Sequence, residues 1–175
     1  LFGAGVAWIY VSIHTYGGAS SLLAGGLTAL FILLWSLTFI PQGYVLSYLR
    51  DRGGWPNAPW MAMTWVLGEW FRGWFLTGFP WLYVGYAHTG TWAGHWAPIG
   101  GVLLVGFVVV LLAELLVRQW RAPNHWRPVV VTGLFALSFS IGSLEFVDRA
   151  GSLKVAGIQA NLDQHTKWYP DQFLS

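Results

Sequence analysis

The chain has 175 residues, of which 55% are hydrophobic, 18% aromatic and 9% charged, whereas soluble domains carry roughly 25% charged residues. Residues 1–49 contain no Lys, Arg, Asp or Glu, and this span is long enough for about two helices that cross a bilayer. The composition therefore predicts an integral membrane protein.

Charge and motif content exclude several further classes. The formal net charge is +2, and the nine basic residues are too scattered to form the stripe of a nucleic-acid-binding protein. The chain has no cysteine, which excludes disulfides, thiolate metal sites and a cysteine nucleophile within these residues. No P-loop, dinucleotide fingerprint or nucleophile elbow occurs, so no cofactor is expected. No two of the five histidines share a helical face at ligand spacing, so no metal site is predicted.

The first half of the chain predicts two helices. Residues 1–13 are typical of the end of a helix, and the absence of Met and of a basic n-region indicates an internal fragment, not a signal peptide. A loop at 16–20 leads to a second helix over 22–49. Pro41 should kink this helix, because proline removes a backbone donor and clashes with the preceding turn. The charged, glycine-rich residues 50–54 should end it.

Three more helices are predicted in the second half. The third, over 59–77, begins with proline, which suits a first helical turn, and breaks at the Gly-Phe-Pro of 78–80. A loop or interfacial segment is expected over 81–96, because it contains three glycines. The fourth and fifth helices are expected over 98–117 and 128–147.

The positions of the arginines predict the orientation. Five arginines lie in two loops on the same side, at 50–52 and 118–127, and the loops on the other side contain none. The positive-inside rule places the arginine loops in the cytoplasm. Five crossings then place the chain after residue 148 outside the cytoplasm, which predicts a multi-pass membrane protein.

These patterns predict two domains. Residues 1–150 should form a transmembrane helical domain, and 151–175 the start of an extracytoplasmic α/β domain. Within the latter, 152–161 is rich enough in Val and Ile to predict a mostly buried strand, followed by a loop leading into a helix. Because one strand is not stable alone, the rest of its sheet should lie beyond Ser175.

Glu69 and Arg72 are the principal candidates for a functional site. Their i, i+3 spacing places them on one helix face, within reach of each other. Charges at membrane depth are costly and face a bundle interior or a wet cavity, so they are candidates for function. The alternative is a structural salt bridge that packs the bundle.

Two other patterns have alternative explanations. The dense aromatic residues between 65 and 86 are typical of interface anchors, although rings at a broken helix end could also receive a lipid tail. Glu114 and Arg118 are spaced i, i+4, which predicts an ion pair whose side chains reach the surface near the end of the fourth helix.

Three segments resemble signatures of the bacterial apolipoprotein N-acyltransferase family, in the same order and spacing. They are residues 5–18 (GVAWIYVSIHTYGG), 69–81 (EWFRGWFLTGFPW) and 159–168 (QANLDQHTKW). The resemblance covers essentially the whole chain, and its middle segment is the most specific. It implies eight transmembrane helices, with a periplasmic nitrilase-like sandwich domain inserted before the last.

The resemblance also implies the reaction. An acyl chain passes from a phospholipid to a cysteine thiol, and then to the free α-amine of the diacylglyceryl-cysteine that begins a lipoprotein. In the family, a Glu acts as general base, a Cys as nucleophile and a Lys stabilises the oxyanion. All three would fall after Ser175, so no catalytic residue is assigned and the fragment should be inactive alone.

Supporting roles are implied for residues that match the signatures. Trp168 should contact lipid or order the mouth of the active site, or else pack in the core of the nitrilase-like domain. Glu69, Arg72 and Trp81 should shape an acyl-chain cavity. Trp8, in the first signature, is a further candidate for lipid binding.

Two other functions stay open from the sequence. A transporter could use Glu69, Arg72 and the break at 78–80 as a substrate or ion site, although no inverted repeat is present. A membrane-anchored nitrilase-like enzyme with a different amine acceptor is the other alternative, because acceptor choice would depend on loops outside this chain.

Overall fold

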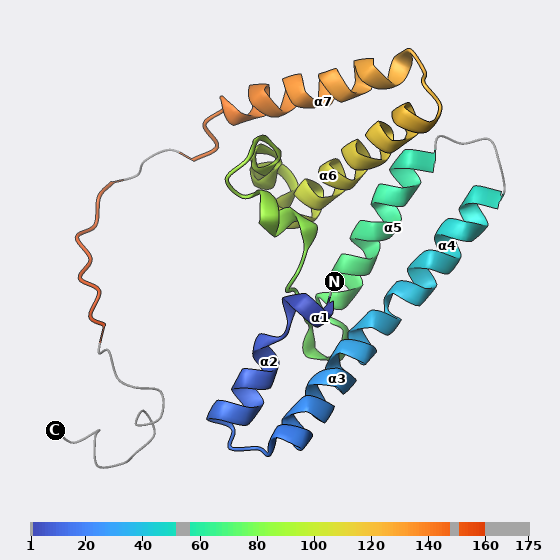
Figure 1. The fold of residues 1–175 in the computed structure, drawn as a ribbon. Coiled ribbons are helices and arrows are strands. Elements are labelled where there is room, and N and C mark those ends of the chain that lie inside the picture. The colour runs from blue at the N-terminus through green and yellow to red at the C-terminus, as the bar shows by residue number, and fades with distance from the viewer. Residues whose placement is uncertain (1, 52–56, 148–150, 160–175) are drawn as a thin grey trace. The chain divides into compact units, whose positions relative to one another are not determined.

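The computed structural model describes residues 2–51, 57–147 and 151–159, and the regular elements within these ranges are all helices (Figure 1). The described residues fall into two compact units. One takes its residues from Leu1–Leu34 and Val147–Ser175, and the other from Trp35–Phe146.

The first unit begins with three short helical segments. They are α1 (Phe2–Gly5), α2 (Trp8–Val11) and the π-helical turn η1 (Ser12–Tyr16). The loop after η1 is closed by a hydrogen bond of 2.7 Å between Nδ1 of His14 and the carbonyl oxygen of Ala19. The predicted helix is therefore present, but it is interrupted after α1 and continues to the start of the loop.

The long helix predicted around Pro41 is divided into α3 (Ser21–Leu37) and α4 (Phe39–Asp51). The break lies where a proline ring clashes with the carbonyl four residues earlier. The hydroxyl of Thr38 donates to the carbonyl oxygen of Trp35 at 2.6 Å and so satisfies a carbonyl at the end of α3. The predicted kink is confirmed.

Helix α5 (Asn57–Arg72) ends earlier than the boundary predicted at Thr77. The backbone then turns back, and the amide of Phe79 donates to the carbonyl oxygen of Arg72 at 2.6 Å. A single 3-10 turn, η2 (Phe75–Thr77), lies within this reversal. The helix ends early because its last carbonyl bonds to the returning chain.

The backbone in this reversal is strained. Leu76, Thr77 and Gly78 have φ angles of 48°, 74° and 91°, and Leu82 follows with 64°. Positive φ is costly for residues with a branched side chain such as Thr, so packing around the segment must maintain this conformation.

Four elements complete the second unit. Two 3-10 helices, η3 (Val84–His88) and η4 (Trp92–Trp96), occupy the segment predicted to be a loop. They lead into α6 (Ala97–Arg121), and α7 (Trp126–Gly142) follows. Helix α6 extends beyond its predicted end at residue 117, whereas α7 ends before its predicted end at residue 147.

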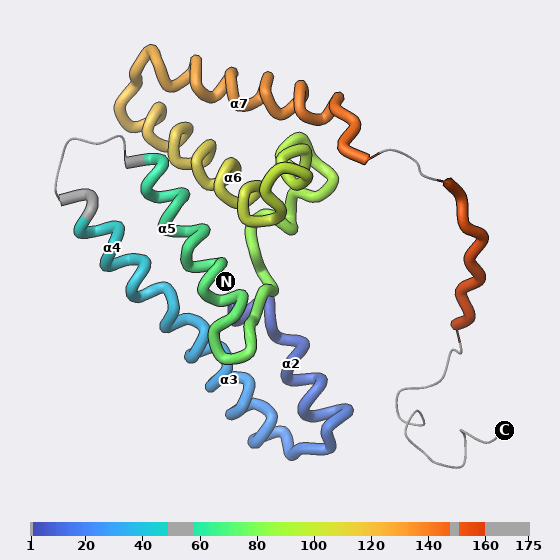
Figure 2. The backbone as a smooth tube through the Cα atoms, turned by 180° about the vertical axis from the view of Figure 1, so that it is seen from behind, coloured from blue at the N-terminus to red at the C-terminus, as the bar shows by residue number. Residues whose placement is uncertain are grey.

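Within the second unit, α4, α5 and α6 lie side by side (Figures 1 and 2). Both η3 and η4 pack on α6, and α7 packs on η4 and α6. The rings of Trp92 and Phe135 are 4.4 Å apart, and Nε1 of Trp96 donates to the buried hydroxyl of Ser138 at 2.6 Å. The irregular segment is thus a packed part of the fold.

Two helical stretches of the described residues are long and apolar enough to cross a membrane, Ser21–Tyr48 and Trp92–Arg121. The helix Trp126–Gly142 is apolar but shorter. Many exposed side chains on these stretches are large and apolar, including Leu22, Leu30 and Val129. Exposed apolar surface of this extent suits contact with lipid. Five crossings stay a prediction.

The strand predicted over 152–161 is not formed in its described part. Residues 151–159 have no regular secondary structure, and all of them are exposed. A strand needs a partner to satisfy its backbone groups, and the described residues contain no other strand. The helix predicted after residue 163 lies outside the described residues.

The close approach of η3 to α6 predicts that a side chain at Gly85 would destabilise the protein. A Cβ atom there would overlap the carbonyl oxygen of Val102 on α6. We expect Gly85→Ala to destabilise the full-length protein by about 2 kcal/mol, because a helix backbone cannot move aside without repacking. Thermal unfolding in detergent measures this.

The matched control is Gly133→Ala on α7, where a Cβ meets nothing within 4 Å. Alanine is the better helix former, so this change should leave the melting temperature equal or raised. Equal melting temperatures for the two variants would show that the backbones of η3 and α6 are not in close contact at Gly85.

Candidate functional site at the end of helix α5

The last turn of α5 carries two fully buried charged side chains. Glu69 is 0% exposed and Arg72 is 1% exposed, and they are the largest side chains buried to this degree among the described residues. Burial of a charge is costly unless opposite charge and hydrogen bonds compensate it. The hydrogen bonds and neighbouring charges around each group therefore decide how its burial is compensated.

The carboxylate of Glu69 joins two segments of the unit. Its Oε1 atom accepts a hydrogen bond of 3.0 Å from Nε1 of Trp65, one turn earlier on α5. The same oxygen accepts a bond of 2.8 Å from the backbone amide of Val84, at the start of η3. Hydrogen bonds to an ionised acceptor are the stronger ones, so Glu69 fixes η3 to α5.

The second carboxylate oxygen of Glu69 faces α6. A Cβ atom placed on Gly106 would lie 3.2 Å from Oε2 of Glu69 and 3.7 Å from the amide nitrogen of Gly85. Gly106 is therefore the position that lets α6 come close to both the carboxylate and η3. A Cβ atom here would be in ordinary contact with the Gly85 nitrogen, but it would require the carboxylate oxygen to move by a few tenths of an ångström.

The guanidinium of Arg72 lies between two aromatic rings. Its central carbon is 5.7 Å from the ring centroid of Phe39 on α4 and 5.6 Å from that of Tyr83. Both distances suit cation–π attraction, which is stronger away from water. The charges of Glu69 and Arg72 also attract each other. Burial raises the pKa of the Tyr83 phenol, and the charge of Arg72 acts in the opposite direction.

An apolar cavity of about 220 Å³ adjoins this cluster. Gly85, the residue after Val84, forms part of its wall, and α6 contributes Val102 and Val105. The other lining residues come from η3, η4 and the residues that flank them, namely Tyr86, Thr89, Gly94 and Ala97. Because Glu69 fixes the start of η3, it also fixes one wall of the cavity.

A row of stacked rings lies along the reversal after α5. The ring of Phe79 stacks on Trp35 at 5.2 Å and on Trp81 at 5.3 Å. Trp81 is 53% exposed, so one side of its ring lies on the surface of the unit. Apolar and exposed, this ring is suited to lipid contact.

The structure brings together only some of the residues predicted as a site. Glu69 and Arg72 lie in one cluster, and Trp81 lies on the reversal that bonds to the end of α5. Trp8 is half exposed at the start of α2, in the other unit. Trp168 lies outside the described residues.

The sequence did not indicate three partners of Glu69. Trp65 could have been found, because it lies four residues before Glu69 on the same helical face. Val84 donates through its backbone, and Gly106 acts by lacking a side chain, so neither residue type signals its role.

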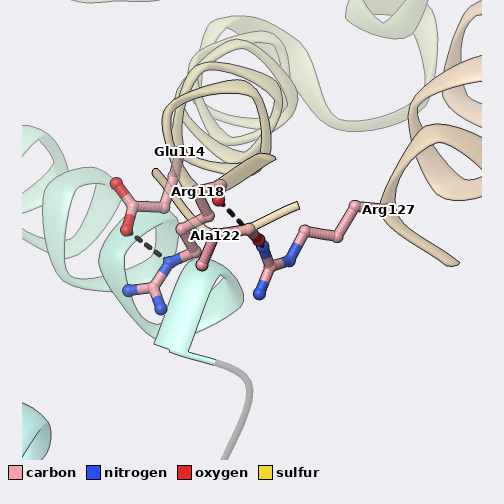
Figure 3. Close-up of polar contacts among 4 residues, drawn as sticks. All are labelled: Glu114, Arg118, Ala122 and Arg127. Atoms are coloured by element: carbon pink, nitrogen blue, oxygen red, sulfur yellow. Dashed lines mark hydrogen bonds and ion pairs between the residues drawn. The ribbon is translucent and has the colours of Figure 1, made fainter. Parts of the chain in front are cut away.

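The ion pair predicted between Glu114 and Arg118 is confirmed. Nε of Arg118 is 2.6 Å from Oε1 of Glu114, and both side chains are partly exposed (Figure 3).

Comparison with known proteins decides the family. Residues 1–115 match the family model described as the apolipoprotein N-acyltransferase N-terminal domain. The chain belongs to the apolipoprotein N-acyltransferase family. The matched range contains the whole Glu69 cluster and the apolar cavity beside it.

Individual apolipoprotein N-acyltransferases are similar along nearly all of the chain. That of Pseudomonas syringae pv. tomato is 42% identical over 98% of the chain, and that of Azotobacter vinelandii is 41% identical over 98%. That of Methylococcus capsulatus is 34% identical over 97%. The chain spans only 36%, 35% and 35% of the length of these relatives, respectively.

The contacts of Glu69 predict that two substitutions lower the free energy of unfolding of the full-length protein by different amounts. Trp65→Phe removes one donor while Val84 still bonds to Oε1, so we expect a loss of about 1 kcal/mol. Glu69→Leu leaves a buried amide, an indole N–H and a buried guanidinium facing an apolar side chain, so we expect a loss of about 3 kcal/mol or more. Chemical denaturation followed by circular dichroism measures both, and equal losses would contradict the joining role of the carboxylate.

Proposed function

We propose that the chain is the membrane part of an enzyme that transfers an acyl chain from a phospholipid to the N-terminal diacylglyceryl-cysteine of a lipoprotein. The transfer would pass through a thioester on a cysteine. The observation that supports this most directly is the match of residues 1–115 to the N-terminal domain of the family. Phospholipid and lipoprotein are therefore the proposed partners.

The proposal gives the apolar cavity beside η3 a role. Its mostly apolar wall, formed by glycine, alanine and valine residues together with Tyr86 and Thr89, suits part of a hydrocarbon chain. The cavity lies where Glu69 holds Val84, so the buried charges would brace the cavity and take no part in the chemistry. Trp81 is exposed on the nearby reversal and would contact lipid outside the cavity.

The remaining parts of the enzyme are proposed from the family resemblance. The chain would cross a bacterial inner membrane five times, with residues after 148 in the periplasm. A nitrilase-like domain would begin at residue 151 and carry the Glu, Lys and Cys of the active site beyond Ser175. The lack of cysteine in this chain agrees with a nucleophile located elsewhere.

Filling the cavity tests the proposal. Val102→Phe in the full-length enzyme should lower kcat/KM for a phospholipid donor with long acyl chains by about ten-fold or more, because the ring occupies the cavity. A donor with short acyl chains should lose much less. Acyl transfer to a diacylglyceryl peptide, followed by mass spectrometry, gives both values.

The matched control is Val129→Phe, at a side chain of α7 that is 70% exposed. This change should leave transfer from both donors unaltered. Unchanged transfer in Val102→Phe, or an equal loss with long and short chains, would argue against an acyl-chain role for the cavity. Transfer to other amines but not to the diacylglyceryl peptide would favour the alternative nitrilase-like enzyme.

A further inference from the structure

A second cavity lies at the opposite end of α6. Its volume is about 280 Å³, roughly that of nine waters at about 30 Å³ each. Val117 and Ala122 contribute to its wall, and the four charged lining residues are Glu114, Arg118, Arg121 and Arg127. Three of the nine basic residues of the chain therefore surround one small space that holds a single carboxylate among its described lining residues.

Two of these arginines are held in place by the end of α6. Arg118 bonds to Glu114 through Nε, which leaves its two terminal nitrogens outside that bond (Figure 3). Arg127 donates from one terminal nitrogen to the carbonyl oxygens of Arg118 and Ala122, which caps the helix. The guanidinium groups are thus positioned before any ligand arrives.

One arginine donor at this place is left without a hydrogen bond to the part of the chain that the structure describes. Among the residues that the structure describes, none accepts a hydrogen bond from the buried Nε of Arg127. Buried donors are nearly always satisfied, so an acceptor from outside the protein is expected here. Arg121 lines the same cavity and takes part in neither of the contacts that fix Arg118 and Arg127.

Aromatic residues place this cavity at the level of lipid headgroups. Trp120 is 90% exposed, and Trp126 is 38% exposed with its ring 5.6 Å from the guanidinium carbon of Arg127. Exposed Trp collects at membrane–water interfaces, and arginines follow the same boundary. By the positive-inside rule, this interface is the cytoplasmic one.

We infer that the arginine cavity binds the phosphate of an anionic phospholipid from the leaflet at this end of α6. Basic cavities between membrane helices hold such headgroups, because a phosphate diester accepts the bidentate bonds that guanidinium groups donate. The cavity is separate from the proposed acyl-chain cavity, since Val102 and Arg118 are about 24 Å apart along the helix axis. The inference does not depend on acyl transfer.

Native mass spectrometry of the full-length protein in detergent tests this. Phosphatidylglycerol should bind as a single adduct, whereas diacylglycerol with the same tails should not. Arg121→Gln should weaken the phosphatidylglycerol adduct by about five-fold, the effect of one basic residue near an anionic headgroup. Arg121→Lys, which keeps the charge, should retain most of the binding.

The matched control is Lys154→Gln, which removes one charge from another exposed position and should leave the adduct unchanged. An unchanged adduct in Arg121→Gln, or an equal loss in both Gln variants, would overturn the inference. Equal binding of diacylglycerol would do so as well. Displacement of the lipid by millimolar inorganic phosphate would show that the ligand is a free anion and would also overturn the lipid assignment.

Discussion

The carboxylate of Glu69 holds the second unit together at the point where its chain changes direction. One oxygen receives the indole of Trp65 and the backbone amide of Val84, while the other faces Gly106 on α6. Helix α5 and the 3-10 helix η3 therefore meet at a single acceptor oxygen, while α6 packs against the other oxygen of the same carboxylate. A buried acceptor of this kind is stable only while its donors stay in place, so η3 is coupled to α5.

This coupling explains several features that would otherwise be costly. The reversal after α5 contains two successive non-glycine residues with positive φ, Leu76 and Thr77, and such strain persists only when the surrounding packing fixes it. The guanidinium of Arg72 lies between two rings at the same place, and its charge offsets that of the carboxylate. Under the proposed function, such a brace would keep the apolar cavity open beside lipid that could otherwise fill or distort it.

The sequence predicted those features that depend on composition and helical spacing. Charge-free apolar runs predicted the long helices, Pro41 predicted the break between α3 and α4, and the i, i+4 spacing predicted the pair of Glu114 and Arg118.

The end of α5 was misplaced because the backbone amide of Phe79, on the returning chain, caps the helix. Val84 and Gly106 were missed as neighbours of Glu69, because a backbone N–H and an absent side chain cannot be recognised from residue type, whereas the spacing of Trp65 could have indicated its contact. The strand over 152–161 was wrong in its described part, because an apolar run forms a strand only beside another.

The most direct test of the account is hydrogen–deuterium exchange of the full-length protein in nanodiscs, read at the peptide covering residues 82–88. In the wild type, the amide of Val84 should be protected by its bond to Glu69. In Glu69→Leu, exchange of this peptide should rise well above the wild-type rate, while a peptide within α7 stays unchanged. Equal protection of residues 82–88 in the two proteins would contradict the account, because η3 would then be held without the carboxylate.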